Sequence, residues 1–239
     1  MVDFYSDLTL REKELLKAIV ELYCKTKKPV SSFDLAKHLN YSLSPATLRN
    51  DSLLLTEKGY LKKIHSFSGR VPTDKGLRFY LFSCLKENRR WKSLERKIID
   101  ETEEFLSRFQ RIKSFQEIIT EIISRKLKSY SFFYSYEKGE IFSKGLNFLM
   151  SEISDLEEEH LDKLGIFLDN LDEILEKMIL KEEINFFIGK ENPYLELEPF
   201  AMIVALNKKR KDIFGVLSHK RNLYFKNIVI LKAIKNFID

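Results

Sequence analysis

Ser44-Pro45-Ala46-Thr47-Leu48-Arg49-Asn50-Asp51 is the most informative stretch of this 239-residue sequence. Ser44 followed by Pro45 predicts the start of a helix, because a serine side chain caps free backbone N–H groups and proline fits the first helical turn. Helical spacing then predicts two faces. The side that we expect to be buried carries Pro45, Leu48, Ser52 and Leu55, while Ala46, Asn50 and Leu53 point outward with Thr47 and Arg49 on the flanks.

The outward side of this predicted helix offers short polar groups, an amide and a guanidinium from its first turns. Asn can pair bidentately with adenine, and Arg with guanine, in the major groove of DNA. A short helix with such groups at its N-terminal end is typical of a helix-turn-helix protein. We therefore expect Thr47, Arg49 and Asn50 to contact bases.

A basic hairpin is predicted directly after this helix, which Gly59 ends. Residues 61–65 can form a strand, 66–69 a turn and 70–73 a returning strand, which is the arrangement of a winged helix. The wing residues expected to meet phosphates or the adjacent minor groove are Lys62, Lys63, His65, Ser68 and Arg70. For either lysine alone, a solvated hairpin remains the alternative interpretation.

Two helices are predicted before the central stretch. Thr9 and Glu12 form a possible capping box at the start of a helix that ends near Thr26. Ser31 or Ser32 caps a second helix, whose N-terminus can place backbone N–H groups on a phosphate. We expect Ser32 and Ser44 to position phosphates. A small protein-binding bundle is the alternative, although it leaves the basic hairpin unexplained.

Charge is unevenly distributed along the chain, although the total is only +5. Residues 1–80 hold 14 basic and 9 acidic residues, whereas the other 159 hold 27 of each. The whole excess therefore lies in the predicted DNA-binding part, as expected for a surface that meets phosphates. Because the excess is modest, two copies on one duplex would bind better than one.

Other classes of protein receive little support from the sequence. No apolar run is long enough to span a membrane, the N-terminus lacks a signal-peptide pattern, and Cys24 and Cys84 lack the spacing of metal ligands or of a disulfide framework. We expect a cytoplasmic protein with structural cysteines. Four scattered histidines, no glycine-rich phosphate loop and no nucleophile motif predict neither an enzyme nor a cofactor or metal site. The carboxylates of Asp172, Glu173 and Glu176 are expected to be solvated.

The first 80 residues resemble the HrcA-type heat-inducible transcription repressors. The segments that carry the resemblance keep the family's order and spacing: Pro29–Ser32, Leu35–Ala36, Ser44–Asp51 and Ser68–Tyr80. Directly after the third segment, Ser52 stands where the family usually has a larger apolar residue, so we expect looser packing under the helix. The resemblance implies a repressor of chaperone operons, bound as a homodimer to an inverted-repeat operator in double-stranded DNA. It also implies release by heat and restoration by a chaperonin, with no membrane involved.

The remaining sequence predicts alternating helices and strands. Residues 86–92 are a predicted linker, 93–113 and 115–127 are helices, and 131–136 with 141–143 form a hairpin. An acidic helix or pair of helices is predicted over about 152–180, and a final helix over 222–238. Strands are expected at 184–188, 200–206 and 213–217, with a basic turn at 208–211 that is solvated or else a second contact with nucleic acid.

The C-terminal part also resembles the HrcA-type family, at Lys144–Leu149, Phe187–Asn192 and Gly215–Leu217, followed by Arg221 and Tyr224. This resemblance implies a GAF-like α/β domain. A segment usual in the family, including an inserted dimerisation subdomain, is missing between Tyr136 and Ile141, which implies a reduced sheet with little room for a ligand pocket. The expected fold is thus α+β, with a winged helix-turn-helix domain over 1–85 and a reduced GAF-like regulatory and dimerisation domain over 86–239.

Two other functions stay open at this point. The first is a winged-helix regulator of other genes whose C-terminal domain senses a small ligand, and a deep apolar pocket with convergent polar groups would favour it. The second is an interaction module or chaperone adaptor that does not bind DNA. A neutral or acidic outward face on the central helix would favour that function.

Overall fold

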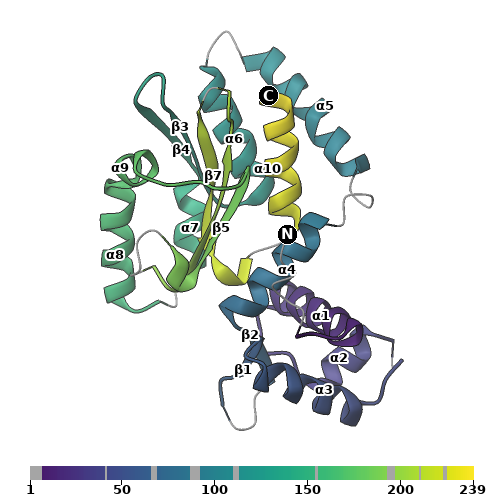
Figure 1. Cartoon of the computed structure of the whole chain (residues 1–239). Helices are drawn as coiled ribbons and strands as arrows, with labels where there is room; N and C mark the ends of the chain where they lie inside the picture. The colour runs from purple at the N-terminus through teal and green to yellow at the C-terminus, as the bar shows by residue number, and fades with distance from the viewer. Residues whose placement is uncertain are drawn as a thin grey trace. The chain divides into compact units, whose positions relative to one another are not determined.

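The structure, a computed structural model, describes residues 7–40, 42–65, 69–86, 92–109, 113–153, 156–192, 197–209, 211–222 and 225–239. The chain forms two compact units, Met1–Lys86 and Glu87–Asp239. Each unit combines helices with an antiparallel sheet (Figure 1). The α+β class predicted from the sequence is therefore confirmed.

Among its described residues, the first unit has four helices and a two-stranded hairpin. In chain order these are α1 (Leu10–Thr26), α2 (Ser32–His38), α3 (Pro45–Glu57), β1 (Leu61–Lys63), β2 (Arg70–Pro72) and α4 (Asp74–Lys86). Its core is built from apolar side chains of all four helices, together with Tyr60 between α3 and β1. Those that are almost completely buried include Leu16, Ile19, Val20, Leu35, Leu48, Leu55, Tyr60 and Leu77.

Helix caps in this unit follow the local sequence signals. Thr9 and Glu12 form the predicted capping box at the start of α1. Ser31, rather than Ser32, caps α2, and its hydroxyl accepts a hydrogen bond from the backbone N–H of Asp34. Ser44 caps α3. These predictions succeed because each cap is an interaction between residues three positions apart.

The second unit is a five-stranded antiparallel sheet covered by helices on both faces. The strands are β3 (Tyr130–Ser135), β4 (Glu140–Lys144), β5 (Ile184–Ile188), β6 (Phe200–Leu206) and β7 (Ile213–His219), and their order in the sheet is β4-β3-β7-β6-β5. The helices are α5 (Lys92–Phe109), α6 (Phe115–Leu127), α7 (Leu146–Glu152), α8 (Glu158–Asp169), α9 (Leu171–Glu176) and α10 (Phe225–Ile238). Two short 3-10 turns, η1 (Gly189–Glu191) and η2 (Lys220–Asn222), follow β5 and β7.

One face of the sheet packs against α7, α8 and α9. Leu149, Leu164, Phe167 and Leu175 from these helices join one buried cluster with strand residues such as Phe132, Tyr134, Met202 and Leu217. Neighbouring strand residues point to the opposite face, where α6 packs on β3 and β4 and α10 on β6. Figure 1 shows α8 and α9 on one side of the strands and α6 and α10 on the other.

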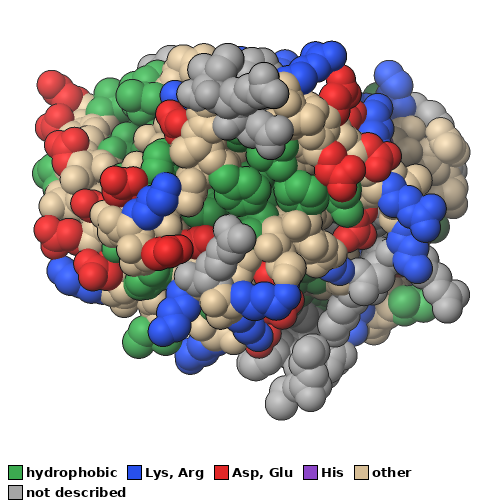
Figure 2. All heavy atoms as spheres, turned by 90° about the horizontal axis from the view of Figure 1, so that it is seen from above, with side chains coloured by type: hydrophobic (Ala, Val, Ile, Leu, Met, Phe, Trp, Pro, Cys, Tyr) green, Lys and Arg blue, Asp and Glu red, His purple; other side chains and the backbone are tan. Residues whose placement is uncertain are grey.

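The acidic run predicted over about 152–180 forms a pair of helices, α8 and α9, which is one of the two arrangements expected. Gly145, with φ +87°, starts α7 before the predicted region. Asn170, with φ −108°, separates α8 from α9. Figure 2 shows acidic side chains gathered along the rim of the surface where α8 and α9 lie. The exposed carboxylates there belong to Glu158, Glu159, Asp162, Asp169, Asp172, Glu173 and Glu176.

The sequence also predicts a linker at 86–92 and a basic turn at 208–211 in the C-terminal part. Residues 87–91 of the predicted linker lie outside the part that the structure describes. In the basic turn after β6, the ammonium of Lys208 lies 3.7 Å from a carboxylate oxygen of Glu183, and Lys209 donates a hydrogen bond to the C-terminal Asp239. These contacts within the chain favour the solvated-turn interpretation.

Replacing either of two glycines of the second unit by alanine should change the free energy of unfolding, in opposite directions. A Cβ atom on Gly215 in β7 would lie 2.2 Å from the carbonyl oxygen of Ile203, whereas no described atom lies within 4 Å of a Cβ on Gly165 in α8. Gly215→Ala should lower the free energy of unfolding by about 1–3 kcal/mol through overpacking. Gly165→Ala should raise it by about 0.5–1 kcal/mol, because alanine favours helix. Urea denaturation checks both values, and changes of the same sign would contradict the packing described.

Candidate nucleic-acid interface

Helix α3 has the two faces that its spacing predicts, except that Pro45, expected on the buried side, is exposed in the first turn. Leu48 and Leu55 are fully buried, whereas Arg49 and Asn50 are exposed. Ser52, expected to loosen the packing, is 5% exposed, and its hydroxyl donates a hydrogen bond of 2.6 Å to the carbonyl of Leu48. The helix satisfies this polar group within its own backbone, so the small side chain lies in the core without an unpaired hydroxyl.

The N-terminal turn of α3 is polar and carries no acidic side chain. The hydroxyl of Ser44 accepts a hydrogen bond of 3.1 Å from the Thr47 backbone N–H and lies 2.9 Å from the Thr47 hydroxyl. Both hydroxyls predicted to meet DNA are thus engaged with each other in the free protein. The positive end of the helix dipole is not neutralised by a carboxylate within this turn, so it favours an approaching anion.

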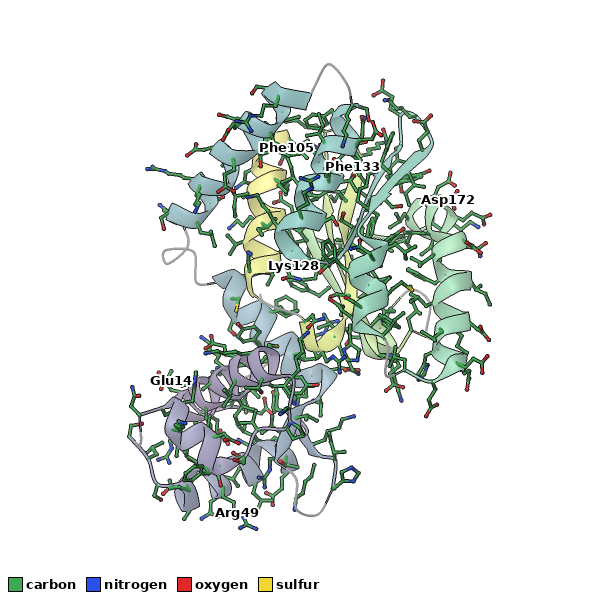
Figure 3. All side chains as sticks on the ribbon, turned by 180° about the vertical axis from the view of Figure 1, so that it is seen from behind. Glu14, Arg49, Phe105, Lys128, Phe133 and Asp172 are labelled. Atoms are coloured by element: carbon green, nitrogen blue, oxygen red, sulfur yellow. The ribbon has the colours of Figure 1, made fainter. Side chains whose placement is uncertain are left out.

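Arg49 and Arg70 bring two guanidinium groups to the same region from α3 and β2. Arg49 projects outward from the ribbon of the first unit (Figure 3), and no ion pair holds it among the described residues. Arg70 is half-buried, and its Nε donates a hydrogen bond of 2.9 Å to the hydroxyl of Thr56. Burial lowers the pKa of Arg70, and the nearby charge of Arg49 lowers it further. Two close cations without a carboxylate between them favour an anion.

The hairpin that follows α3 is fixed to the segment before α2. Val30 and Arg70 exchange two backbone hydrogen bonds of 2.8 and 2.9 Å. A Cβ atom on Gly69 would lie 2.4 Å from the Val30 carbonyl, so glycine permits this close approach. Lys62 and Lys63 are exposed on β1. The structure therefore places Arg70 opposite Lys63, at the loop end of the paired strands. Ser68 lies outside the described residues.

The N-terminus of α2 differs from that of α3. The hydroxyl of Ser31 donates a hydrogen bond of 2.6 Å to the carboxylate of Asp34, which lies in the first helical turn. This carboxylate already neutralises the positive end of the helix, and it disfavours a phosphate there. Ser32, the first helical residue, is half-buried. Of the two serines predicted to position phosphates, Ser44 therefore has the more favourable electrostatic surroundings.

Several lysines counted in the basic excess are held by carboxylates inside the first unit. Lys58 donates hydrogen bonds of 2.7 Å to both the Glu12 carboxylate and the Asp7 carbonyl. Lys75 lies 4.0 Å from the centre of the Tyr60 ring and 3.7 Å from the Asp7 carboxylate. The Lys58 contacts join the start of α1 to the end of α3. Arg49, Arg70 and the two β1 lysines are the cations that remain beside the outward face of α3.

Sequence reasoning missed a further contact that fixes α3. The guanidinium of Arg11 on α1 binds the carboxylate of Asp51 at 2.6 Å. Asp51 directly follows Arg49 and Asn50, so the pairing neutralises a negative charge that would otherwise weaken phosphate binding at this helix. Forty positions separate the partners, and no local pattern links them. Besides Arg11, sequence reasoning did not single out Lys37, which is exposed in the last turn of α2.

Metal and membrane sites find no support among the residues described. No group of three His, Cys, Asp or Glu side chains is placed to hold a metal ion in this part of the chain. Among the helices with described residues, none is both long enough and apolar enough to cross a membrane. Cys24 is buried, and burial raises the pKa of its thiol to about 12, which disfavours the reactive thiolate.

Comparison with known protein families assigns the chain to one of them. The family model described as the HrcA protein C terminal domain matches residues 80–228, which is more than half of the chain. The chain belongs to the HrcA family.

Relatives in the HrcA family match the chain over different lengths. The heat-inducible transcription repressor HrcA of Phytoplasma mali is 29% identical over 267 residues, which cover 96% of this chain and 76% of that protein. The repressor of the same name from Mesoplasma florum is 27% identical over 97% of this chain and 75% of its own length. That of Thermoanaerobacter sp. (strain X514) reaches 45% identity over 76 residues, or 32% of this chain and 22% of that protein.

A solved structure shares the fold of this HrcA-family chain. It is a crystal structure at 2.2 Å resolution titled only as a hypothetical protein. The match has a TM-score of 0.77 and covers 96% of this chain and 97% of the other, at 20% sequence identity. This likeness concerns the fold alone.

The carboxylates that hold Lys58 and Tyr60 make the stability of the first unit depend on pH. The pKa of Glu12 is lowered, chiefly by the hydrogen bond from Lys58 and then by the Thr9 backbone, and the Tyr60 hydroxyl lowers the pKa of Asp7. Such groups stabilise the fold fully above their unfolded-state pKa and lose that contribution as pH falls through the folded-state value. Stability should therefore decline below a pH of about 4.5, the ordinary pKa of Glu.

Lys58→Met should lower the free energy of unfolding at pH 7 by about 1–2 kcal/mol, because it leaves the buried Glu12 carboxylate without its cation. The deficit relative to the parent should shrink below pH 4.5 as Glu12 becomes protonated. Lys62→Met, at an exposed lysine of the same unit, is the control and should change stability by less than about 0.5 kcal/mol. Equal effects of the two substitutions in urea denaturation would contradict the role assigned to Lys58.

Proposed function

We propose that this HrcA-family chain is a DNA-binding transcription repressor whose first unit is a winged helix-turn-helix domain. In this proposal α3 is the recognition helix and the β1–β2 hairpin is the wing. The observation that carries it is the exposed Arg49–Asn50 face of α3, flanked by Arg70 and by Lys62 and Lys63 of the hairpin. A guanidinium and an amide on one exposed helix, beside a basic hairpin, can bind the base edges and phosphates of a major groove.

Roles are assigned to individual side chains within this surface. Thr47, Arg49 and Asn50 contact base edges, with Arg49 as the strongest candidate for a bidentate contact to guanine. The phosphate contacts give register and orientation rather than sequence preference. They are assigned to Ser32, Ser44, Lys62, Lys63, Ser68 and Arg70.

The regulated genes are proposed from the relatives named above, which are titled heat-inducible transcription repressors. We place this chain in the same role, at the promoters of chaperone operons. Two copies bind an inverted repeat, with recognition helices about one duplex turn apart. Heat weakens the folded dimer and releases the operator, and a chaperonin assists its return to the active state.

The second unit is proposed as a reduced GAF-like domain that supports dimerisation. Its sheet is filled on both faces by helices, as the burial of Phe132 and Phe133 on opposite faces of β3 indicates. A hollow of about 270 Å³ between α5 and α6 is lined by Phe105, Ile122 and five charged residues, whose side chains leave most of its surface apolar. Several of these are paired with one another, such as Lys126 with Glu101 and Arg108 with Glu104.

Arg49→Ala tests the proposed base contact. Removing the guanidinium should weaken binding to the operator by about 1–3 kcal/mol and relax the preference for one base pair, because a bidentate contact is lost. Lys63→Ala should weaken binding to all duplexes alike and reduce the salt dependence by about one released counterion. Fluorescence anisotropy titrations at several salt concentrations, with operator and shuffled duplexes, measure both effects.

Binding of both variants with parental affinity and salt dependence would overturn this surface as the DNA interface. Glu14→Ala on α1 serves as the matched control. Glu14 lies away from the Arg49 side of the first unit (Figure 3), so its substitution should leave both the operator affinity and the salt dependence within error of the parent.

A further inference from the structure

Strand β4 lies at one edge of the five-stranded sheet, with β3 on its inner side. In the part of the chain that the structure describes, no strand pairs with its outer side. Glu140, Ser143 and Lys144 are exposed, and Ile141 and Phe142 are half-buried. An edge strand of this kind presents a row of backbone donors and acceptors that can pair with another chain.

Hydrogen bonds elsewhere in the sheet fix which residues of β4 present their backbone to the outside. The Asn207 backbone N–H donates a hydrogen bond of 2.9 Å to the carbonyl of Asp212, and these residues lie opposite each other in the β6–β7 register. Bonding alternates along an antiparallel strand. The backbone N–H and C=O groups of even-numbered residues of β7 therefore form hydrogen bonds with β6. Those of odd-numbered residues form hydrogen bonds with β3.

The same alternation continues through β3 to β4. Odd-numbered residues of β7 lie opposite even-numbered residues of β3, so the odd-numbered residues of β3 bond to β4. Phe133 lies opposite Phe142, which places the backbone groups of Phe142 toward β3. The N–H and C=O groups of Ile141 and Ser143 consequently point away from the sheet.

A second copy of β4 fits this edge in one antiparallel register. With a twofold axis at Phe142, Ile141 of each copy lies opposite Ser143 of the partner subunit, and each such pair exchanges two hydrogen bonds. Glu140 of each copy then lies opposite Lys144 of the partner subunit, which gives two pairs of opposite charge across the axis. Moving the register by two residues toward the turn places Lys138 opposite Lys144, which is a repulsive pair. Moving it by two residues the other way places Glu140 opposite Leu146, so both attractive pairs are lost. Charge therefore selects the register centred on Phe142.

Aromatic side chains reinforce the same register. Phe142 lies opposite Phe133, which in turn lies opposite Phe214 and stacks on it with ring centroids 5.8 Å apart. Figure 3 shows Phe133 within the second unit, among the side chains between the strands and the helices. In the twofold register the two Phe142 side chains meet at a non-hydrogen-bonded position, where cross-strand side chains approach most closely. The aromatic row would then run across both copies.

We propose that β4 is the dimer interface of this chain, pairing antiparallel with β4 of a second copy about an axis at Phe142 to form one ten-stranded sheet. The inference deepens the proposed function, since it names the surface that joins the two copies on the operator, and it rests on that function for its biological role. The opposite edge, β5, has no charged residue between Ile184 and Ile188 and therefore carries no comparable register signal.

Charge reversal tests the interface on the intact chain. Glu140→Lys creates two repulsive lysine pairs across the axis, and Lys144→Glu creates two repulsive glutamate pairs. Each variant alone should raise the dimer dissociation constant about ten-fold in sedimentation equilibrium. The double variant Glu140→Lys/Lys144→Glu and an equimolar mixture of the two single variants should both return to the parental value, because opposite charges again face each other.

Folding controls accompany the measurement, since Lys144 also interacts electrostatically with Glu117 on α6. Thermal unfolding followed by circular dichroism should show a cooperative transition for every variant. Restoration by mixing is independent of such local effects, because neither single variant changes when the two are combined. Recovery in the mixture therefore supports contact between β4 strands of different copies.

Three results would overturn the interface: single variants that dimerise like the parent, a double variant or mixture as weak as the single variants, or a parent that is monomeric throughout. The test is separable from the proposed function. A parent that binds operator DNA specifically yet dimerises without β4 would overturn the interface alone. A parent that dimerises as described but shows no preference for operator DNA would overturn the repressor role alone.

Discussion

Burial of Leu48 and Leu55 is the constraint on which the candidate DNA interface depends. These two leucines lie at helical spacing on α3 and are fully buried. Removing such side chains from water contributes about 1.5–3 kcal/mol each, far more than any exposed polar contact of the same helix. Because they can be buried in only one rotation of α3, Arg49 and Asn50 must face outward. The outward surface is thus a consequence of the core beneath it.

Internal ion pairs decide which charges that surface presents. Lys58 and Lys75 are held near Glu12 and Asp7, and Asp51 is neutralised by Arg11. The Lys58 and Arg11 pairs join α1 to α3, and the Arg11 pair neutralises the carboxylate next to Asn50. Arg49, Arg70, Lys62 and Lys63 therefore give α3 and the hairpin a net positive charge. Concentration of positive charge, more than its total, determines attraction to a phosphate backbone.

Local signals in the sequence predicted much of the fold and part of the site. The capping residues Thr9 and Ser44 and the buried face of α3 could be predicted because each depends on residues within one or two helical turns. The five strands of the second unit could be predicted from short apolar runs. Contacts between distant positions could not, as with Arg11 and Asp51 or Arg70 and Thr56. Only the packing of α1 and β2 against α3 brings those partners together.

The measurement that tests the account most directly is a binding titration of the intact chain against the host's own chaperone promoter and against a shuffled duplex of equal length. The account predicts that the promoter binds more tightly by at least about 10³-fold and that affinity for both duplexes falls steeply with salt. Equal affinity for the two duplexes, or binding that does not change with salt, would contradict it.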